Sequence, residues 1–301
     1  PHAERAKEQF SLEYTSSDPS EGIQQSARLS EIEDINSKQK LEDLSAKSDS
    51  IIFDTVGISE DTIKIIEEEI FLRTSESPED REVPDPESVP EVPDNIDEQV
   101  KDLVHHFAME AVREEDDGVI PVYQADDRPD MLDRIVERFE DAYGEHAADR
   151  LIEVDEILGT ESASEEAYPN LRAFVAEDLF DYHVDRMANT PIVWRFTTER
   201  LVSDPEGEGF ACLVDYHQLD AGIFDRLQNR YLEPRKALLR EQRSAANRRR
   251  GDESLSASEQ ADAAEEYARC ESGLEQIAVF EDRLADLAQP EPREWPEENR
   301  Q

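Results

Sequence analysis

Two short apolar segments, residues 192–196 and 210–216, stand out in a chain that is otherwise dominated by Asp and Glu. Both segments are rich in Val, Ile and aromatic residues, the types that favour β-strands. The polar loop between them contains glycines and a proline, which are typical of turns. The pattern predicts a β-hairpin over residues 191–217. Because both segments are apolar on both faces, we expect helices or a partner surface to cover the hairpin.

Helical periodicity lies on the N-terminal side of this hairpin. Apolar residues at spacings of three and four predict helices over residues 96–111, 131–143, 147–158 and 174–187. Gly144 and Gly159 directly follow two of these helices. A glycine with positive φ often ends a helix, so we expect that conformation at both positions.

Helical periodicity also follows the hairpin, from residue 223 onward. Pro234 is expected either to begin a helix or to kink a continuing one. Ser256 and Glu259 have the spacing of a capping box, which predicts the start of a long second helix. The apolar residues of this second helix recur at spacings of three and four, so residues 223–288 are expected to form a helical hairpin or short coiled coil.

The N-terminal part of the chain has a different character. Residues 1–50 are polar with scattered Leu and Ile, and we expect a loosely ordered start. Residues 51–73 predict a short strand over 51–56, a turn at Gly57 and a following helix. Residues 74–94 combine five prolines with an acidic run, which predicts an extended linker because proline interrupts helices and sheets.

These patterns predict a mainly α fold with a small β component. We expect a helical domain over residues 95–222 that packs around the buried hairpin, followed by the helical hairpin and a tail over residues 289–301. The residues expected in the core are Phe174, Phe180, His183, Trp194, Phe196 and Leu213.

The charge of the chain points to a salty environment. It carries 76 acidic and 32 basic residues, a formal net charge of −44, and only seven of the basic residues are Lys. A dense carboxylate surface with few lysines suits a protein that stays hydrated in molar salt, where the screening length is about 3 Å. We therefore expect a salt-loving cytoplasm. The apolar residues fall in periodic blocks, which favours a folded state for at least the second two-thirds of the chain.

The sequence offers few groups suited to catalysis or metal binding. Cys212 and Cys270 lie far apart with no CxxC pair, and both are expected to be buried. Three histidine groups lack a third ligand at metal-binding spacing, so we expect structural or surface roles for them: His105 with His106, His183 with Asp185, and His217 with Asp215. No P-loop, G-x-S-x-G motif or apolar run of about 18 residues is present. We expect no catalytic, metal-binding or cofactor-binding residue and no membrane partner.

One stretch reverses the acidic bias. Between residues 226 and 250, nine basic residues accompany only Glu233 and Glu241. The stretch could contact phosphates, because the planar guanidinium of Arg holds two oxygens. It could instead pair with the acidic helix that follows, and the sequence leaves both alternatives open. The candidate DNA-binding residues are Arg226, Arg230, Arg235, Lys236, Arg240, Arg243, Arg248, Arg249 and Arg250.

Four segments resemble a known enzyme family. They read DGVIPVY, DMLDRIVERFEDAYGEHAADRLIEVDEILG, LRAFVAEDLFDYHVDRMANTPIVWRFTT and GFACLVDYHQLDAGIFDRLQNRYLEPRKALL. In this order they are similar to the C-terminal region of the large adenine-specific DNA methyltransferases of BREX phage-defence systems, the PglX family. Type IIG restriction-modification enzymes share a related layout. The resemblance covers residues 95–245.

The most specific part of the resemblance is the spacing Phe-x5-Phe-x2-His ahead of a Pro-Ile pair. Here it is formed by Phe174, Phe180 and His183, followed by Pro191 and then by Ile192, Trp194 and Phe196. Thr190 and Val193 stand where the family typically has Arg and Tyr.

The resemblance implies a role within a larger enzyme. Such methyltransferases bind S-adenosylmethionine through a Gly-containing motif and hold a flipped adenine with an Asn-Pro-Pro-Tyr-type motif. The sequence contains no Pro-Pro dipeptide. We therefore expect a C-terminal piece of a longer protein or split gene, of haloarchaeal origin, that lacks the catalytic lobe and its cofactor site.

The resemblance implies that this piece corresponds to the helical spacer and to part of the target-recognition region of such an enzyme. Its expected partners are double-stranded DNA, the catalytic methyltransferase lobe and other BREX components. The alternative, which rests on the acidic composition, is a protein–protein interaction module without DNA contact.

Overall fold

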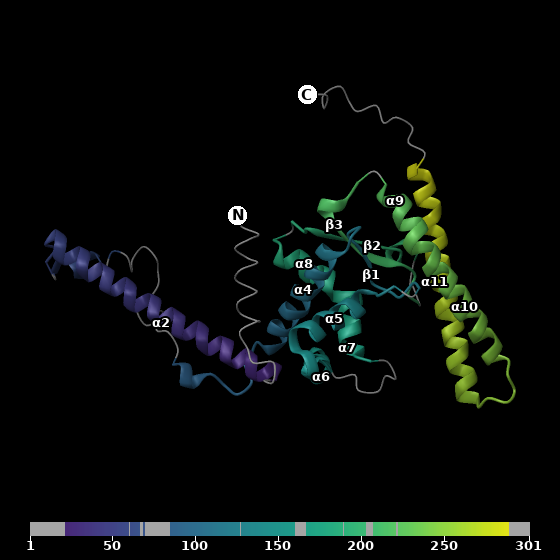
Figure 1. The fold of residues 1–301 in the computed structure, drawn as a ribbon, viewed down its shortest axis with the longest axis horizontal. Helices are drawn as coiled ribbons and strands as arrows, with labels where there is room; N and C mark the ends of the chain where they lie inside the picture. The colour runs from purple at the N-terminus through teal and green to yellow at the C-terminus, as the bar shows by residue number, and fades with distance from the viewer. Residues whose placement is uncertain are drawn as a thin grey trace, which may run out of the picture. The chain divides into compact units, whose positions relative to one another are not determined.

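The computed structural model describes residues 22–59, 61–66, 69, 85–126, 128–159, 167–188, 190–202, 207–220 and 222–288 (Figure 1). The chain divides into two compact units, residues 1–100 and 101–301. The described residues are mainly α-helical with one small antiparallel sheet, which confirms the predicted fold class. The tail over residues 289–301 and residues 1–21 lie outside the described residues.

A long helix, α2 (Ile23–Val56), dominates the first unit. It corrects two predictions: residues 23–50 are helical and not loosely ordered, and residues 51–56 form the last turns of this helix and not a strand. A short apolar run fits a helix as well as a strand, so periodicity alone could not separate the two. Gly57 ends the helix in the left-handed region with a φ of 72°, and its N–H donates to the carbonyl of Phe53.

The residues after Gly57 agree in part with the sequence. Residues 61–66 are helical, as predicted. Most of the predicted linker, residues 74–84, lies outside the described residues. Its last part is folded: Pro86–Ser88 form a 3-10 turn, the side chain of Asp85 accepts a hydrogen bond from the backbone amide of Glu87, and Val89 is buried.

A three-stranded antiparallel sheet forms the centre of the second unit. It consists of β1 (Val119–Pro121), β2 (Val193–Thr197) and β3 (Ala211–Asp215) in the order β1-β3-β2. The β2–β3 pair confirms the predicted hairpin, with Trp194 opposite Val214. The third strand, β1, was not predicted, because its apolar run is too short to distinguish a strand from a loop. It makes β3 the central strand, and all five residues of β3 are buried.

Helices of the chain's middle part lie near the sheet. They are α4 (Ile96–Glu114), α5 (Met131–Tyr143), α6 (Ala147–Leu158), α7 (Pro169–Ala173) and α8 (Leu179–Arg186). Of these, α8 contacts β2, α5 packs on α6, and α6 packs on α7. The predicted ranges of α5 and α6 are confirmed. The helix predicted from residue 174 begins earlier, at Pro169, and passes through a π-helical segment, Phe174–Asp178, before α8.

The two glycines that follow helices have different roles. Gly144 has a φ of 55°, as predicted. Gly159 has a φ of −172°, which is ordinary extended backbone and corrects the prediction of a positive φ. A Cβ at Gly159 would lie 2.3 Å from the side-chain oxygen of Asn170. The residue therefore serves the close approach of Asn170 and not a left-handed turn.

The C-terminal residues form a helical hairpin, as predicted. Its first arm comprises α9 (Ile223–Arg226), a π-helical segment (Leu227–Leu232) and α10 (Glu233–Arg250). Its second arm is α11 (Ala257–Ala288), and the two arms run side by side (Figure 1). The capping box is confirmed: the backbone amides of Ser256 and Glu259 donate to each other's side chains over 2.7 and 3.3 Å.

Pro234 neither begins a separate helix nor ends one, because the helical turns continue through it. Proline has no N–H, so the carbonyl four residues earlier, that of Arg230, loses its usual donor. Arg128 donates a guanidinium hydrogen bond to this carbonyl from a distant loop. The π-helical segment and this bond together accommodate Pro234 inside the arm.

One buried cluster lies between the sheet and the helical hairpin. Val214 and Cys212 of β3 share a buried cluster with Leu227 and Ile277 from the two arms. Among the residues predicted for the core, Phe174, His183 and Leu213 are buried, and Phe180 and Phe196 are partly buried.

Trp194 corrects the core prediction, because 45% of its surface is exposed. It projects from the same face of β2 as Phe196, but it stacks on Tyr216 at the rim of the sheet.

Candidate nucleic-acid interface

The nine basic residues predicted to contact DNA do not form one exposed surface. Arg235 is only 5% exposed. Its guanidinium donates to the backbone carbonyls of Gly209, Gln124 and Glu208 over 2.9, 2.7 and 3.0 Å. These bonds join α10 to the residues that follow β1 and precede β3. Arg235 is therefore a structural residue, which corrects its assignment as a DNA contact.

Several basic residues of α10 pair with acidic residues of α11. Lys236 lies 2.5 Å from Glu281, and Arg243 lies 3.9 Å from Glu271. Arg249 forms an ion pair with Glu266, and Arg250 lies over the ring of Tyr267 at 3.9 Å. These contacts are those expected if the basic stretch pairs with the acidic helix across the hairpin.

The two basic residues nearest the sheet are also paired. Arg226 forms an ion pair with Asp220 at 2.9 Å. Arg230 lies 2.7 Å from Asp117, which also accepts a hydrogen bond from the Tyr231 hydroxyl over 2.7 Å. Water and salt screen such exposed pairs, so an external phosphate could still compete for either arginine.

Arg240 and Arg248 differ from the other seven candidates. Both are exposed, and among the residues that the structure describes neither forms an ion pair or, like Arg250, lies over an aromatic ring. They lie eight residues apart on α10, about 12 Å along the helix axis at 1.5 Å per residue. Because the helix repeats every 3.6 residues, both project from the side away from the buried Leu239 and Ala246. This outer face of α10 is the part of the predicted interface that is open to a phosphate.

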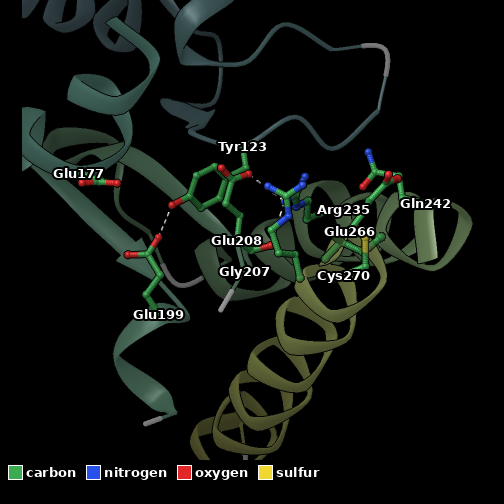
Figure 2. A pocket seen from close by; sticks show the side chains of 11 residues that line it. Tyr123, Glu177, Glu199, Gly207, Glu208, Arg235, Gln242, Glu266 and Cys270 are labelled. Carbon is green, nitrogen blue, oxygen red and sulfur yellow. Dashed lines mark hydrogen bonds and ion pairs between the residues drawn. The ribbon is translucent and has the colours of Figure 1, made fainter. Parts of the chain in front are cut away.

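A pocket of about 740 Å³ lies between the sheet and the helical hairpin (Figure 2). Arg235 and Arg269 contribute positive charge to its lining, and four glutamates contribute negative charge: Glu177, Glu199, Glu208 and Glu266. Figure 2 shows the Tyr123 hydroxyl directed at Glu199, to which it donates a hydrogen bond. Glu199 also forms an ion pair with Arg195 at 3.0 Å.

The pocket contains no activated nucleophile. Burial raises the pKa of the Tyr123 hydroxyl, and the hydrogen bond to Glu199 raises it further. Burial likewise raises the pKa of the Cys270 thiol, with a smaller contribution from Glu266. Both groups are therefore protonated near neutral pH, and a protonated thiol is a weak nucleophile. The arrangement can bind or position a group, but its side chains are not poised for covalent chemistry.

Two of the predicted histidine groups come together inside the fold. The Nε2 atom of His105 lies 2.9 Å from Nδ1 of His183. The other ring nitrogen of His183 accepts hydrogen bonds from the backbone amides of Ile192 and Val193, each over 3.2 Å. His183 therefore holds the start of β2 against α4 and α8, which gives a physical reason for its spacing from the Pro-Ile pair.

The remaining candidates have structural or surface positions. His106 lies 3.6 Å from Glu110 on the next turn of its helix, and His217 is exposed. Cys212 and Cys270 are free thiols and are buried, as predicted. Across the described ranges, no group of three or more His, Cys, Asp and Glu side chains could hold a metal ion.

The exposed aromatic residues beside β2 are functional candidates that the sequence pattern did not predict. Trp194 and Tyr216 stack with ring centroids 6.2 Å apart, although both were read as parts of buried strands. The available signal was the alternation along β2, in which the buried Val193 is followed by Trp194 on the opposite face.

No protein-family model matches the sequence, and no curated protein matches it either. Within the ranges that the structure describes, no helix combines the length and the apolar character needed to cross a membrane.

Proposed function

We propose that this chain is the non-catalytic, DNA-contacting segment of a site-specific N6-adenine DNA methyltransferase that acts in phage defence in the cytoplasm. In this proposal it helps to position DNA, while a separate lobe binds S-adenosylmethionine and transfers the methyl group. The observation that supports the proposal is that the segments resembling the family meet in one folded unit. The first segment supplies β1, the third supplies α8 and β2, and the fourth supplies β3, α9 and the start of α10.

Specific contacts join these segments. The Tyr231 hydroxyl, from the fourth segment, donates to the carbonyl of Val119 in the first over 3.1 Å. Arg235, also from the fourth, reaches the carbonyl of Gln124 directly after the first. In the third segment, His183 bonds the amides that lead into β2. The residues that carry the resemblance therefore pack together within the second unit of this chain.

The proposed DNA contact is the outer face of α10, through Arg240 and Arg248. Arginine suits this role because its planar fork can hold two phosphate oxygens. Two phosphate contacts make only a small electrostatic contribution to the free energy of DNA binding. Shape and hydrogen bonding would therefore carry more of the binding at high salt. The helical hairpin would act as a rigid arm that keeps these two residues in place.

Binding of the full chain to an adenine-containing duplex, measured by fluorescence anisotropy over a range of KCl concentrations, tests this proposal. The double variant Arg240→Gln/Arg248→Gln should flatten the plot of log Kobs against log [salt] by about 1.8, or roughly 0.9 per lost phosphate contact. The matched control is Arg243→Gln/Arg249→Gln, which removes the same charge from residues that pair with α11. The proposed contact is wrong if both double variants change the slope equally or if neither changes it.

The second candidate function is an acidic protein–protein interaction module. The internal pairing of Lys236, Arg243 and Arg249 favours it, because it neutralises much of the basic stretch within the chain itself. Under this alternative the wild-type chain shows no duplex binding, even at the lowest salt at which it stays folded. The same titration therefore separates the two candidates.

A further inference from the structure

Three large aromatic side chains are exposed at one rim of the sheet. The exposed fractions of Trp194, Tyr216 and Phe224 are 45%, 52% and 42%. They come from β2, from the turn after β3 and from α9. We call these three residues the aromatic patch. Single exposed apolar residues are common on protein surfaces, but adjoining aromatic residues are typical of binding sites.

Ring contacts connect the members of the aromatic patch. Trp194 and Tyr216 stack with their planes 22° apart. Two residues after Trp194, the partly buried Phe196 meets the edge of Phe224 at a centroid distance of 6.3 Å. Because residues i and i+2 of a strand project from the same face, Trp194 and Phe196 form one row between Tyr216 and Phe224. The patch is therefore continuous, and Phe196 anchors it to the core.

The charges beside the aromatic patch are mainly negative. The segment that carries Tyr216 and Phe224 also contains Asp220 and Asp225, against a single arginine, Arg226. Asp220 holds this arginine through both carboxylate oxygens, at 3.0 and 2.9 Å. The neighbourhood therefore keeps an excess of carboxylate, which repels phosphate and attracts cationic groups.

We propose that the aromatic patch docks a protein segment that combines apolar side chains with Arg or Lys. Tyr and Trp are enriched among the residues that dominate binding energy at protein interfaces. A guanidinium or ammonium group can also lie over an aromatic face, an interaction for which Trp is the best partner. The patch lies on the sheet rim and not on the outer face of α10, so the proposal holds whether or not α10 contacts DNA.

Two other occupants fit the charge less well. A nucleic acid would bring phosphates close to Asp220 and Asp225, with Arg226 already paired. A second copy of this chain would bring the same carboxylates and a further net charge of −44. A basic, apolar protein segment is the occupant whose charge complements the patch.

Selection from a random dodecapeptide display library tests this proposal, with the full chain as bait in 1 M KCl. The salt suppresses general attraction of basic peptides to the acidic surface, because the screening length falls to about 3 Å. We expect the selected peptides to be enriched both in apolar residues and in Arg or Lys. The Trp194→Ser/Tyr216→Ser variant should raise the Kd of the best peptides by at least about tenfold, as loss of a Trp and Tyr hot spot would.

The matched control is Leu41→Ser/Leu44→Ser, which removes two other exposed apolar side chains, from α2. It should leave the Kd of the selected peptides unchanged. A circular dichroism melt of each variant verifies that it remains folded. The partly exposed positions of Trp194 and Tyr216 make a large loss of stability unexpected.

Three results would overturn the proposal. The first is a set of selected peptides that bind the patch variant as tightly as wild type, or that are enriched in acidic residues. The second is a single-stranded oligonucleotide whose binding depends on Trp194 and Tyr216, which would assign the patch to nucleic acid. The third is concentration-dependent dimerisation, seen by sedimentation, that disappears in the patch variant and would assign the patch to a second copy of the chain.

Discussion

The imidazoles of His105 and His183 are joined by a hydrogen bond between Nε2 of His105 and Nδ1 of His183, 2.9 Å apart. Nε2 of His183 faces the backbone amides of Ile192 and Val193 and must therefore be unprotonated. Its proton sits on Nδ1 and is donated to His105, so the network assigns both tautomers. A proton added to either acceptor nitrogen would break one of these bonds. The fold thus depends on a neutral histidine pair.

Acidification should destabilise the protein through this pair. Burial, with the charges of His183 and Arg186, lowers the pKa of His105 from 6.5 to about 3, and burial with Arg113 lowers that of His183 to about 4. Below about pH 6.5 these two histidines bind protons in the unfolded chain but not in the folded protein. Their full contribution to the free energy of unfolding is therefore present above that pH and decreases as the pH is lowered toward 4. Between pH 7.5 and 5.5 the two groups should together remove about 2 to 3 kcal/mol from the free energy of unfolding. Chemical denaturation at a constant KCl concentration measures the free energy of unfolding at each pH.

The variant His105→Gln provides the control for this pH dependence. A glutamine carbonyl can accept the proton of His183 but does not titrate in this range. The variant should lose about 1.4 kcal/mol of the change between pH 7.5 and 5.5, the contribution of one histidine. Equal pH profiles for wild type and His105→Gln would contradict the role of the pair.

Arg235 should be among the residues most sensitive to substitution. Arg235→Gln removes a buried guanidinium that satisfies three backbone carbonyls, and leaving buried acceptors without donors costs about 1 to 3 kcal/mol each. We expect a loss of at least about 3 kcal/mol in the free energy of unfolding. Arg240→Gln, on the exposed face of the same helix, should stay within about 0.5 kcal/mol of wild type. A mild effect of Arg235→Gln would show that water replaces the guanidinium at these carbonyls.

Trp194 and Leu213 lie on neighbouring strands but should respond differently to truncation. Leu213 is 2% exposed on the central strand, so Leu213→Ala should cost about 2 to 5 kcal/mol. Trp194→Ala removes a stacked but half-exposed ring, and we expect a loss of about 1 kcal/mol. Thermal melts of both variants in the same KCl concentration measure the difference. A melting temperature for Trp194→Ala as low as that of Leu213→Ala would place the tryptophan in the core.

The folded state should require salt. The net charge of −44 produces self-repulsion that is screened over about 10 Å at 0.1 M salt but over about 3 Å at 1 M. We expect the melting temperature of the wild-type chain to rise steadily as KCl is increased from 0.1 to 2 M. A circular dichroism melt at each concentration provides the measurement. Maximal stability at low ionic strength would contradict adaptation to molar salt.

The chain alone should not methylate DNA. The sequence lacks the Pro-Pro dipeptide with which the family it resembles holds a flipped adenine. Incubation of the full chain with labelled S-adenosylmethionine and an adenine-containing duplex should therefore give background incorporation. Incorporation above that of a heat-denatured sample would show that the chain contains a catalytic site.

Local patterns predicted much of the second unit. The helices 131–143 and 147–158, the hairpin of β2 and β3 and the capping box at Ser256 follow from periodicity and end signals that act over a few residues. The strand assigned to residues 51–56 failed for the same local reason. Its apolar run fits either state, and the helix that arrives from Ile23 decides between them.

Which residues of the candidate interface are exposed depends on contacts between segments that are distant in sequence. The sequence located the basic stretch, but it did not distinguish the buried Arg235 from the exposed Arg240, five residues further along the same helix. That difference arises because α10 turns one face toward the carbonyls of Gln124, Glu208 and Gly209, which lie far from it in sequence. No local pattern encodes which carbonyls will lie opposite a given arginine.

The sequence by itself determined the acidic charge, the positions of most helices and the one hairpin, because composition, helical periodicity and turn residues act locally. Only the tertiary structure decided that β1 joins the hairpin as a third strand, that His105 meets His183, and that Trp194 stays at the surface. Each of these outcomes depends on which distant segments pack together. The packing that forms is the one that buries the whole core most favourably. No single stretch of the chain therefore determines it.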